Sequence, residues 1–183
     1  MGTVLETDRL LLRGWTLEDA DSLYKYAKDP LVGPMAGWLP HKDESYSRAF
    51  IRVVLSKKEN YAICLKGGDN EPIGSIGLSF MGDHNNPANE KEAVLGYWIG
   101  VPFWGNGYVP EAAREIIRHG FVDLELDRIY CGYFEGNDKS KRVQQKLGFK
   151  FHHVDPMTKV PMLDDIRTEY VNVLEAGDYI NFS

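Results

Sequence analysis

The stretch LGYWIGVPFWGNGYV, residues 95–109, decides the fold. It begins as an uncharged aromatic run typical of a strand, and it ends in two glycines, Gly105 and Gly107. The following residues, PEAAREII, predict a helix that begins near Val109. A strand that passes through a glycine turn into a helix is suited to anions, because the first helical N–H groups lack partners and the macrodipole is positive there. A plain strand-to-helix turn without a ligand is the alternative that this pattern alone leaves open.

Size and charge limit the class of protein. The chain has 183 residues, of which 43% are hydrophobic and 26% charged, as in globular proteins, so we expect a single domain over residues 1–183. The net charge of −6 argues against nucleic-acid binding and is compatible with an amine ligand. No apolar run reaches the roughly 20 residues of a membrane span, so no membrane partner is expected.

The cysteines and the N-terminus bear on location. Cys64 and Cys131 lie in separate apolar runs, and neither has a partner at metal-ligand spacing. We therefore expect buried reduced thiols and no bound metal. Because residues 1–6 lack the features of a signal peptide, the sequence predicts a cytoplasmic protein.

The apolar periodicity predicts alternating strands and helices. Strands are expected at about residues 7–15, 60–65, 73–81, 92–100, 127–134, 149–154 and 168–174, and helices at about 16–29, 44–57, 109–121 and 139–147. The strands at 60–100 should form an antiparallel meander, and residues 155–165 a polar connection. A helical crossover makes the strands at 92–100 and 127–134 parallel. The expected class is α+β (α/β layered), with a mixed sheet and helices on both faces.

A second polar turn, Glu135–Asp138, follows the strand at 127–134. The two turns then lie at the ends of neighbouring parallel strands. Ligands of open α/β sheets bind at such ends. The sequence therefore predicts one ligand region that both turns serve.

These motifs resemble the GNAT superfamily of acetyl-CoA-dependent N-acetyltransferases, and in particular its RimJ/RimL-like branch. The resemblance covers residues 5–175 and rests on ordered motifs at Thr7–Arg13, Leu95–Gly100, Trp104–Tyr108, Glu111–Ala112, Asn137–Ser140 and Lys146–Phe149. It implies the GNAT-like fold, whose mixed, mostly antiparallel sheet is splayed at its centre. It also implies acetyl-CoA as the co-substrate.

The family's cofactor contacts transfer to matching positions. The resemblance places the pyrophosphate on the backbone of Trp104, Gly105, Asn106, Gly107, Tyr108 and Val109, and the pantetheine arm along Trp98, Ile99, Gly100 and Val101. Asn137 should hydrogen-bond the pantetheine, and Ser140 should lie near the thioester sulfur. Arg142 is a candidate contact for the adenosine phosphates, with an exposed basic helix face as the alternative.

Two positions depart from the family. Pro102 stands three residues before the first glycine of the turn, where many members have Gln or Arg. Gln144 stands where many members have a tyrosine that protonates the departing thiolate. Ser140 is the substitute that we predict for that tyrosine.

The implied reaction is direct attack of an amine on the thioester in a ternary complex. The amine must be neutral, which is easier for an α-amine, with a pKa of about 7.7–8.0, than for a lysine near 10.4. Glu92 is the first candidate for a helping base, ahead of Glu90 and Asp83, and a solvated strand-end charge is the alternative for Glu92. The N–H of Ile99 or of Gly100 should polarise the thioester carbonyl.

The acceptor side is less defined. The irregular aromatic segment 31–42 contains Trp38, which is either a pocket wall or core, and His41, a candidate substrate-pocket residue. His152 and His153 are adjacent in a strand, so they should point to opposite faces and form no metal site. A protein N-terminus and a small-molecule amine both remain open as acceptors.

Two other classes of function stay open. The missing tyrosine allows a catalytically silent acyl-CoA-binding sensor module. A domain that binds adenine nucleotides without preference for the pantetheine arm is the other alternative. A homodimer is one expectation for the assembly, since symmetric dimers are common.

Overall fold

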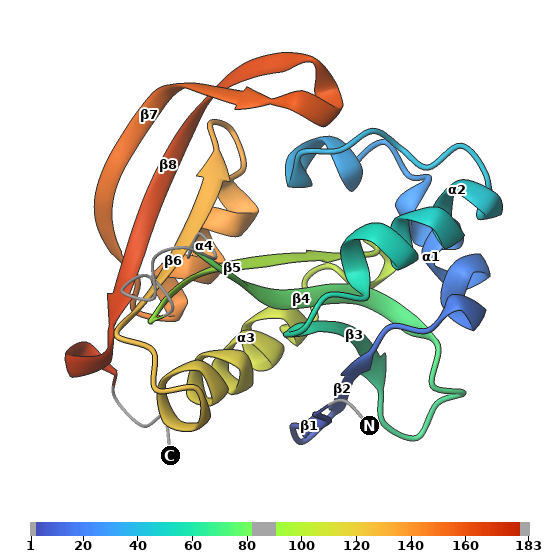
Figure 1. The fold of residues 1–183 in the computed structure, drawn as a ribbon, viewed down its shortest axis with the longest axis horizontal. Coiled ribbons are helices and arrows are strands. Elements are labelled where there is room, and N and C mark those ends of the chain that lie inside the picture. The colour runs from blue at the N-terminus through green and yellow to red at the C-terminus, as the bar shows by residue number, and fades with distance from the viewer. Residues whose placement is uncertain (1–2, 82–90, 180–183) are drawn as a thin grey trace. The chain divides into compact units, whose positions relative to one another are not determined.

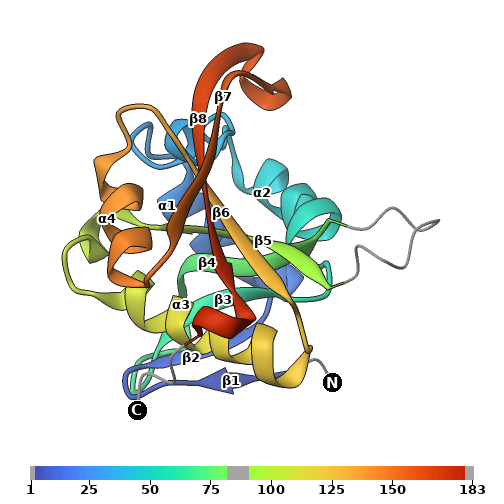
Figure 2. The ribbon, with the colours of Figure 1, turned by 90° about the vertical axis from the view of Figure 1, so that its left-hand side faces the viewer.

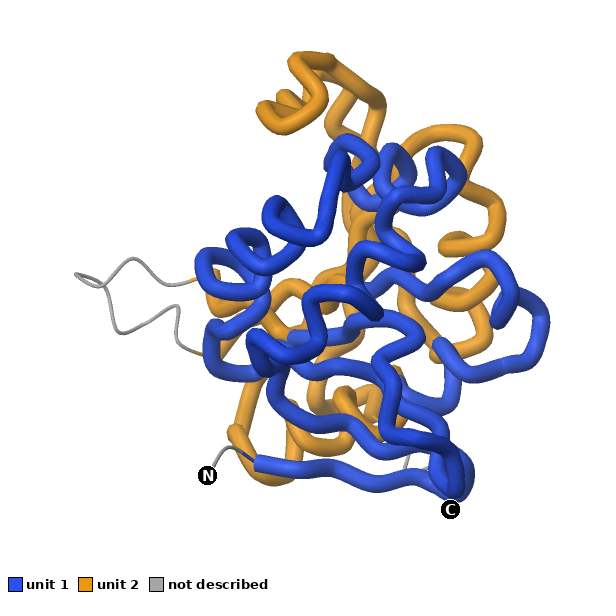
Figure 3. The backbone as a smooth tube through the Cα atoms, turned by 90° about the vertical axis from the view of Figure 1, so that its right-hand side faces the viewer, with its two compact units in different colours: residues 1–77, 97–112 blue, residues 78–96, 113–183 orange. Residues whose placement is uncertain are grey.

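The computed structural model describes residues 3–81 and 91–179 of the chain. The chain divides into two compact units, and each unit consists of two chain segments (Figure 3). The first unit contains residues 1–77 and 97–112, and the second contains residues 78–96 and 113–183. The single domain expected over residues 1–183 stays a prediction.

The first unit contains antiparallel strands in the order β1-β2-β3-β4. Their bounds are β1 Leu5–Glu6, β2 Leu10–Gly14, β3 Asn60–Leu65 and β4 Pro72–Phe80, and the last residues of β4 belong to the second unit. Helices α1 (Ala20–Ala27) and α2 (Glu44–Phe50) follow β2 (Figure 1). A capping box precedes α1, because the Asp19 carboxylate accepts a 2.8 Å hydrogen bond from the Thr16 N–H.

The core of the first unit is rich in aromatic rings. Trp15 and Trp38 are both buried, and each lies against the partly buried Trp98. The Trp15 indole N–H donates to Ser75 Oγ at 3.1 Å, so this buried polar group is satisfied. The aliphatic residues Leu23, Ile51 and Leu55 complete the same cluster.

The second unit contains strands in the order β5-β6-β8-β7. Their bounds are β5 Glu92–Ile99, whose end lies in the first unit, β6 Arg128–Phe134, β7 Lys150–Val160 and β8 Asp165–Glu175. Helix α3 (Tyr108–Arg118) begins in the first unit, and α4 (Asp138–Lys146) lies beside β6 (Figures 1 and 2).

The parallel pairing of β5 with β6 confirms the crossover prediction. The ladder has three residue pairs, from Glu92–Arg128 to Val94–Tyr130. Within the described part of the second unit, Leu95 and Gly96 continue β5 without joining that ladder. The two strands therefore stop pairing part-way along, as the predicted splay of the sheet requires.

The pairing of β4 with β5 agrees with the antiparallel meander. In the first unit the Gly100 N–H donates to the Ile73 carbonyl at 2.9 Å. In the second unit the Met81 N–H donates to the Glu92 carbonyl at 3.0 Å. Ile73 near the start of β4 thus pairs with Gly100 just after β5, whereas Met81 after β4 pairs with Glu92 at the start of β5. Residue numbers rise along one strand as they fall along the other, which is the antiparallel pattern.

The predicted connection at 155–165 is wrong. Strand β7 continues to Val160 and β8 begins at Asp165, so the two form one long hairpin (Figure 2). Among the strands that the structure describes, β7 pairs only with β8, and it is largely exposed, so it needs no apolar alternation. Pro156 is tolerated because it lies at a register shift on this edge strand.

The opposite orientation expected for His152 and His153 is also wrong. Their Nδ1 atoms are 2.6 Å apart and their rings are in contact. A register shift between Phe151 and His153 interrupts the side-chain alternation on which the expectation depends.

Helices α2 and α3 are each followed by a π-helical turn. The helices expected at 44–57 and 109–121 each finish in a π-helical turn, at Ile51–Leu55 and His119–Asp123 respectively. Among the described residues, no helix combines the length and apolarity that crossing a bilayer requires.

Candidate cofactor and catalytic site

The glycine turn has the backbone form that the sequence predicts. Gly105 and Gly107 both have a φ of +79°, and α3 begins at the next residue, Tyr108. A Cβ at Gly105 would meet nothing within 4 Å, so the outer side of the turn is open. Such a surface of bare backbone can approach a phosphate group closely.

The start of α3 leaves few donors for an anion. The Glu111 N–H donates to the Gly107 carbonyl at 3.2 Å, and Pro110 has no N–H. Helix geometry leaves the N–H groups of Tyr108 and Val109 without partners inside the helix. These two groups are the helical donors that fit the predicted pyrophosphate position.

A hydrogen-bond network ties this turn to the start of β2. The Glu111 carboxylate accepts from Thr7 Oγ1 at 2.6 Å and from the Arg9 backbone N–H at 2.9 Å, and it pairs with Arg9 Nη2 at 2.6 Å. Arg9 also donates to the Asn106 carbonyl at 3.2 Å and lies 4.6 Å from the centre of the Tyr108 ring. The network therefore holds both the turn and the first turn of α3.

The same network determines the charge state of Glu111. Burial raises the pKa of Glu111, but the hydrogen bonds from Thr7 and Arg9 outweigh it, so the pKa lies below its usual value. Glu111 is thus ionised near neutral pH, and Arg9 neutralises it. Without Arg9 this carboxylate would repel an anion at the helix start. Sequence reasoning missed this network because its members lie about 100 residues apart.

The strand before the turn presents alternate N–H groups to opposite sides. The Gly100 N–H is used by Ile73, as described above, so the Ile99 N–H points away from β4. Of the two donors expected for the thioester carbonyl, Ile99 therefore fits better than Gly100. The Trp104 indole donates to the Ile99 carbonyl at 3.0 Å and links the turn back to the strand.

The two predicted acceptor-pocket residues lie in the core of the first unit. Trp38 is 6% exposed and His41 is 3% exposed. His41 Nδ1 is 2.8 Å from Ser47 Oγ, whereas its Nε2 has no hydrogen-bond partner in the part of the chain that the structure describes. Burial lowers the pKa of His41 to about 4, so the imidazole is neutral at pH 7. Contact with an acceptor stays a prediction for both residues.

The start of α4, in the second unit, holds the next predicted group. Asn137 caps the helix, since its Oδ1 accepts from the Ser140 N–H at 3.2 Å. Ser140 is buried and Arg142 is exposed on the same helix. Gln144 is fully buried, and its amide donates to Ser140 Oγ at 3.1 Å. Gln144, which departs from the family pattern, therefore contacts Ser140 directly, a contact that the sequence does not predict.

Glu92 has a structural partner. Its carboxylate lies 3.1 Å from Arg128 Nη1, at the first residue of β5. The ion pair fits the alternative of a strand-end charge, and the role of Glu92 as a base stays a prediction. The weaker candidates, Asp83 and Glu90, lie outside the described residues.

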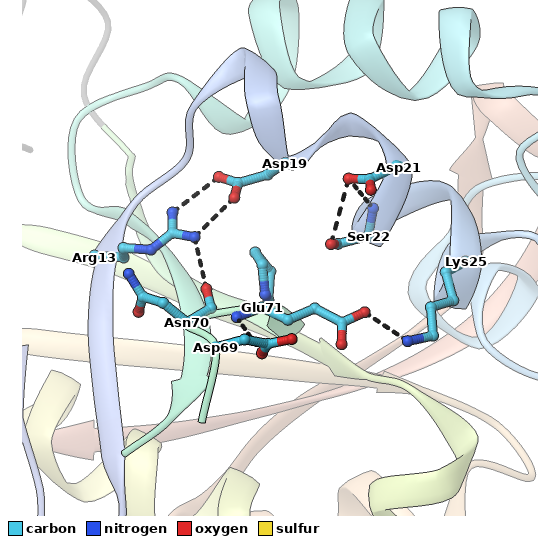
Figure 4. A pocket seen from close by; sticks show the side chains of 9 residues that line it. Arg13, Asp19, Asp21, Ser22, Lys25, Asp69, Asn70 and Glu71 are labelled. Carbon is cyan, nitrogen blue, oxygen red and sulfur yellow. Dashed lines mark hydrogen bonds and ion pairs between the residues drawn. The ribbon is translucent and has the colours of Figure 1, made fainter. Parts of the chain in front are cut away.

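A polar cavity of about 510 Å³ in the first unit contains none of the predicted site residues (Figure 4). Arg13 makes paired hydrogen bonds of 2.7 and 2.8 Å to Asp19, and Lys25 pairs with Glu71 at 2.7 Å. These ion pairs connect β2, α1 and the turn before β4 across the cavity. These charged groups of the cavity lining are thus paired with one another.

Comparisons with known proteins identify the family and the fold of the chain. The family described as Acetyltransferase (GNAT) domain matches residues 9–150. An uncharacterised N-acetyltransferase of Bacillus licheniformis is 34% identical over 80% of this chain and 82% of its own length. A putative ribosomal N-acetyltransferase of Bacillus subtilis is 38% identical over 44% of this chain and 42% of its own length. A GNAT-family acetyltransferase structure from Bacillus anthracis superposes with a TM-score of 0.83 at 22% identity, over 96% of this chain and 99% of its own.

The fold is that of an acetyltransferase, and the matched family and relatives agree with it. The chain belongs to the GNAT acetyltransferase family.

Proposed function

We propose that the protein transfers an acetyl group from acetyl-CoA to a primary amine by direct attack in a ternary complex. The observation that carries this proposal is the pair of positive φ angles at Gly105 and Gly107, immediately before α3. Together with family membership, this open turn suits the pyrophosphate of the cofactor.

The remaining roles follow the family pattern. The pantetheine arm runs along Trp98–Val101, the Ile99 N–H polarises the thioester carbonyl, and Asn137 binds the pantetheine. Ser140 donates a hydrogen bond to the departing sulfur, and Arg142 contacts the adenosine phosphates. Trp38 and His41 contribute to the acceptor pocket.

The acceptor is either a protein N-terminus or a small-molecule amine. An α-amine suits the site because a fraction of it is neutral at pH 7 without a strong base. The name of the Bacillus subtilis relative supports protein amines. We also propose that the protein is cytoplasmic, in keeping with two buried cysteines outside any disulfide bond, and forms a homodimer.

A catalytically silent acyl-CoA sensor is the second candidate, because Gln144 replaces the tyrosine acid. Both proposals require the protein to bind acetyl-CoA. Titration calorimetry with acetyl-CoA, CoA and ADP tests this binding. We expect acetyl-CoA and CoA to bind much more tightly than ADP, and equal binding of ADP would contradict both.

Release of CoA thiol separates the enzyme from the sensor. The assay uses acetyl-CoA with a free-N-terminal peptide, an N-acetylated lysine peptide, a polyamine and an aminoglycoside. We expect at least one acceptor to accelerate release above hydrolysis. Tight acetyl-CoA binding without accelerated release by any acceptor would favour the sensor.

A further inference from the structure

Strand β7, in the second unit, carries two adjacent histidines whose side chains converge. The Nδ1 atoms of His152 and His153 are 2.6 Å apart, and their ring centres are 4.9 Å apart. Both residues are exposed. Imidazole nitrogen is a ligand for transition-metal ions, so two such nitrogens that meet at the surface can chelate an ion.

A local irregularity of the strand brings the two rings together. In a regular strand, adjacent side chains point to opposite faces and could not bind one ion. The register of β7 against β8 shifts between Phe151 and His153, as at a β-bulge, and bulges redirect side chains. The His152 ring also meets the Tyr130 ring of β6 edge-on, with the ring centres 5.4 Å apart. The backbone and Tyr130 therefore orient the pair before any ligand binds.

The contact between the two rings is a hydrogen bond that an ion can replace. In the neutral pair, one Nδ1 atom donates its proton and the other accepts with its lone pair. A metal ion needs a lone pair on both atoms. The donating imidazole provides it when its proton moves to Nε2, so both rings stay neutral and the pair loses no proton.

The separation of the two nitrogen atoms indicates which ions fit. Two nitrogens about 2.0 Å from one ion are about 2.8 Å apart at neighbouring corners of a square plane, and about 3.3 Å apart at a tetrahedral centre. The observed 2.6 Å is closer to the square-planar value. Cu²⁺ and Ni²⁺ prefer such coordination, and Cu²⁺ binds a given set of nitrogen ligands more strongly.

We propose that His152 and His153 form a surface site that binds one Cu²⁺ ion through both Nδ1 atoms. Acetyl transfer, as proposed above, involves neither histidine. The part of the chain that the structure describes contains no group of three or more His, Cys, Asp or Glu side chains that could hold a metal. Water therefore completes the coordination, and the bound ion stays accessible to other ligands.

Titration calorimetry with Cu²⁺ in a weakly coordinating buffer tests the site. The variants are His152→Gln, His153→Gln and the double variant, since glutamine is polar but lacks the imidazole ring. We expect each single variant to weaken binding at this site about tenfold or more, because a single imidazole loses the gain from chelation. The double variant measures binding by any other group of the chain, and the wild type should bind one further ion.

Lys159→Gln is the matched control. It introduces the same amino acid at another exposed position of β7, so we expect it to bind Cu²⁺ as the wild type does. Electron paramagnetic resonance of the wild type with one equivalent of Cu²⁺ should show coupling to two imidazole nitrogens, and each single variant should show coupling to fewer. His152→Phe keeps an aromatic ring against Tyr130, and it serves if His152→Gln does not fold.

Two results would overturn the proposal. If the wild type and the double variant bound Cu²⁺ with the same stoichiometry and affinity, the histidine pair would hold no ion. If the wild-type spectrum showed coupling to only one imidazole nitrogen, the two rings would not act as a chelate.

Discussion

At the scale of single residues, Gly105 is the sharpest test of the turn. A Cβ at this position would meet no other atom within 4 Å, so alanine fits sterically. However, φ is +79°, a backbone conformation that alanine strongly disfavours. We expect Gly105→Ala to cost about 1 kcal/mol of stability and to weaken acetyl-CoA binding, since the turn must strain or relax. Chemical denaturation and calorimetry measure the two effects.

Gly14→Ala is the matched control for this variant. Its Cβ would also meet nothing within 4 Å, but Gly14 is not among the glycines with positive φ. We expect little change in either measurement. Equal effects at Gly14 and Gly105 would contradict a special role for the turn conformation.

Asp19 links stability to pH. Burial raises the pKa of Asp19, but hydrogen bonds from Arg13 and from the Thr16 N–H outweigh burial, so the pKa lies below its usual value. A carboxyl group whose pKa is lower in the folded state adds stability above its unfolded pKa of about 4, and this stability is lost as pH falls through the folded value.

The corresponding variant is Asp19→Asn. We expect it to cost roughly 3 kcal/mol at pH 7, because it leaves Arg13 partly buried without its counter-charge. Urea denaturation across pH 2–7 should show the gap between wild type and variant narrowing below about pH 4. A gap that is constant with pH would refute the ion-pair explanation.

At the scale of elements, local patterns were enough to predict most strands and helices. The strand, the glycine turn and α3 follow one another within residues 92–118, so periodicity and the glycines define them without distant contacts. The β7–β8 hairpin is longer than the sequence predicts, because an exposed edge strand carries no apolar alternation. Gln144 and Asn172 meet only through pairing that a single sequence does not reveal.

The support of α3 by β2 gives a prediction at this scale. Glu111→Gln keeps the shape of the side chain but loses the charge that pairs with Arg9. The unpaired carboxamide holds Arg9 less firmly, so the turn should become less ordered. We expect weaker binding of acetyl-CoA, by about tenfold, as for a lost interaction of ~1.4 kcal/mol.

Glu115→Gln is the control on the same helix. Glu115 pairs with Arg118 at 2.8 Å, further along the helix from the glycine turn. We expect this change to leave the calorimetric affinity intact. If both variants lost a similar amount of affinity for acetyl-CoA, the cause would be reduced stability of α3 and not disorder of the glycine turn.

At the scale of the whole molecule, cofactor binding should raise thermal stability. A ligand at 100 times its Kd stabilises the folded state by about 2.7 kcal/mol. For a chain of this size the expected rise in Tm is roughly 5–10 °C. Scanning calorimetry with acetyl-CoA measures it, and ADP at the same concentration is the control. An equal rise with ADP would contradict preference for the pantetheine arm.

The division into two units, each made from two chain segments, also bears on synthesis of the protein. The ribosome completes both segments of the first unit, and with them the glycine turn, before residues 113–183 exist. Residues Glu92–Val94 of β5 are made well before Arg128–Tyr130, their partners on β6. During translation this side of β5 is therefore an unpaired strand edge, and such edges are prone to aggregation. We therefore expect the nascent chain to be most prone to aggregation in that interval.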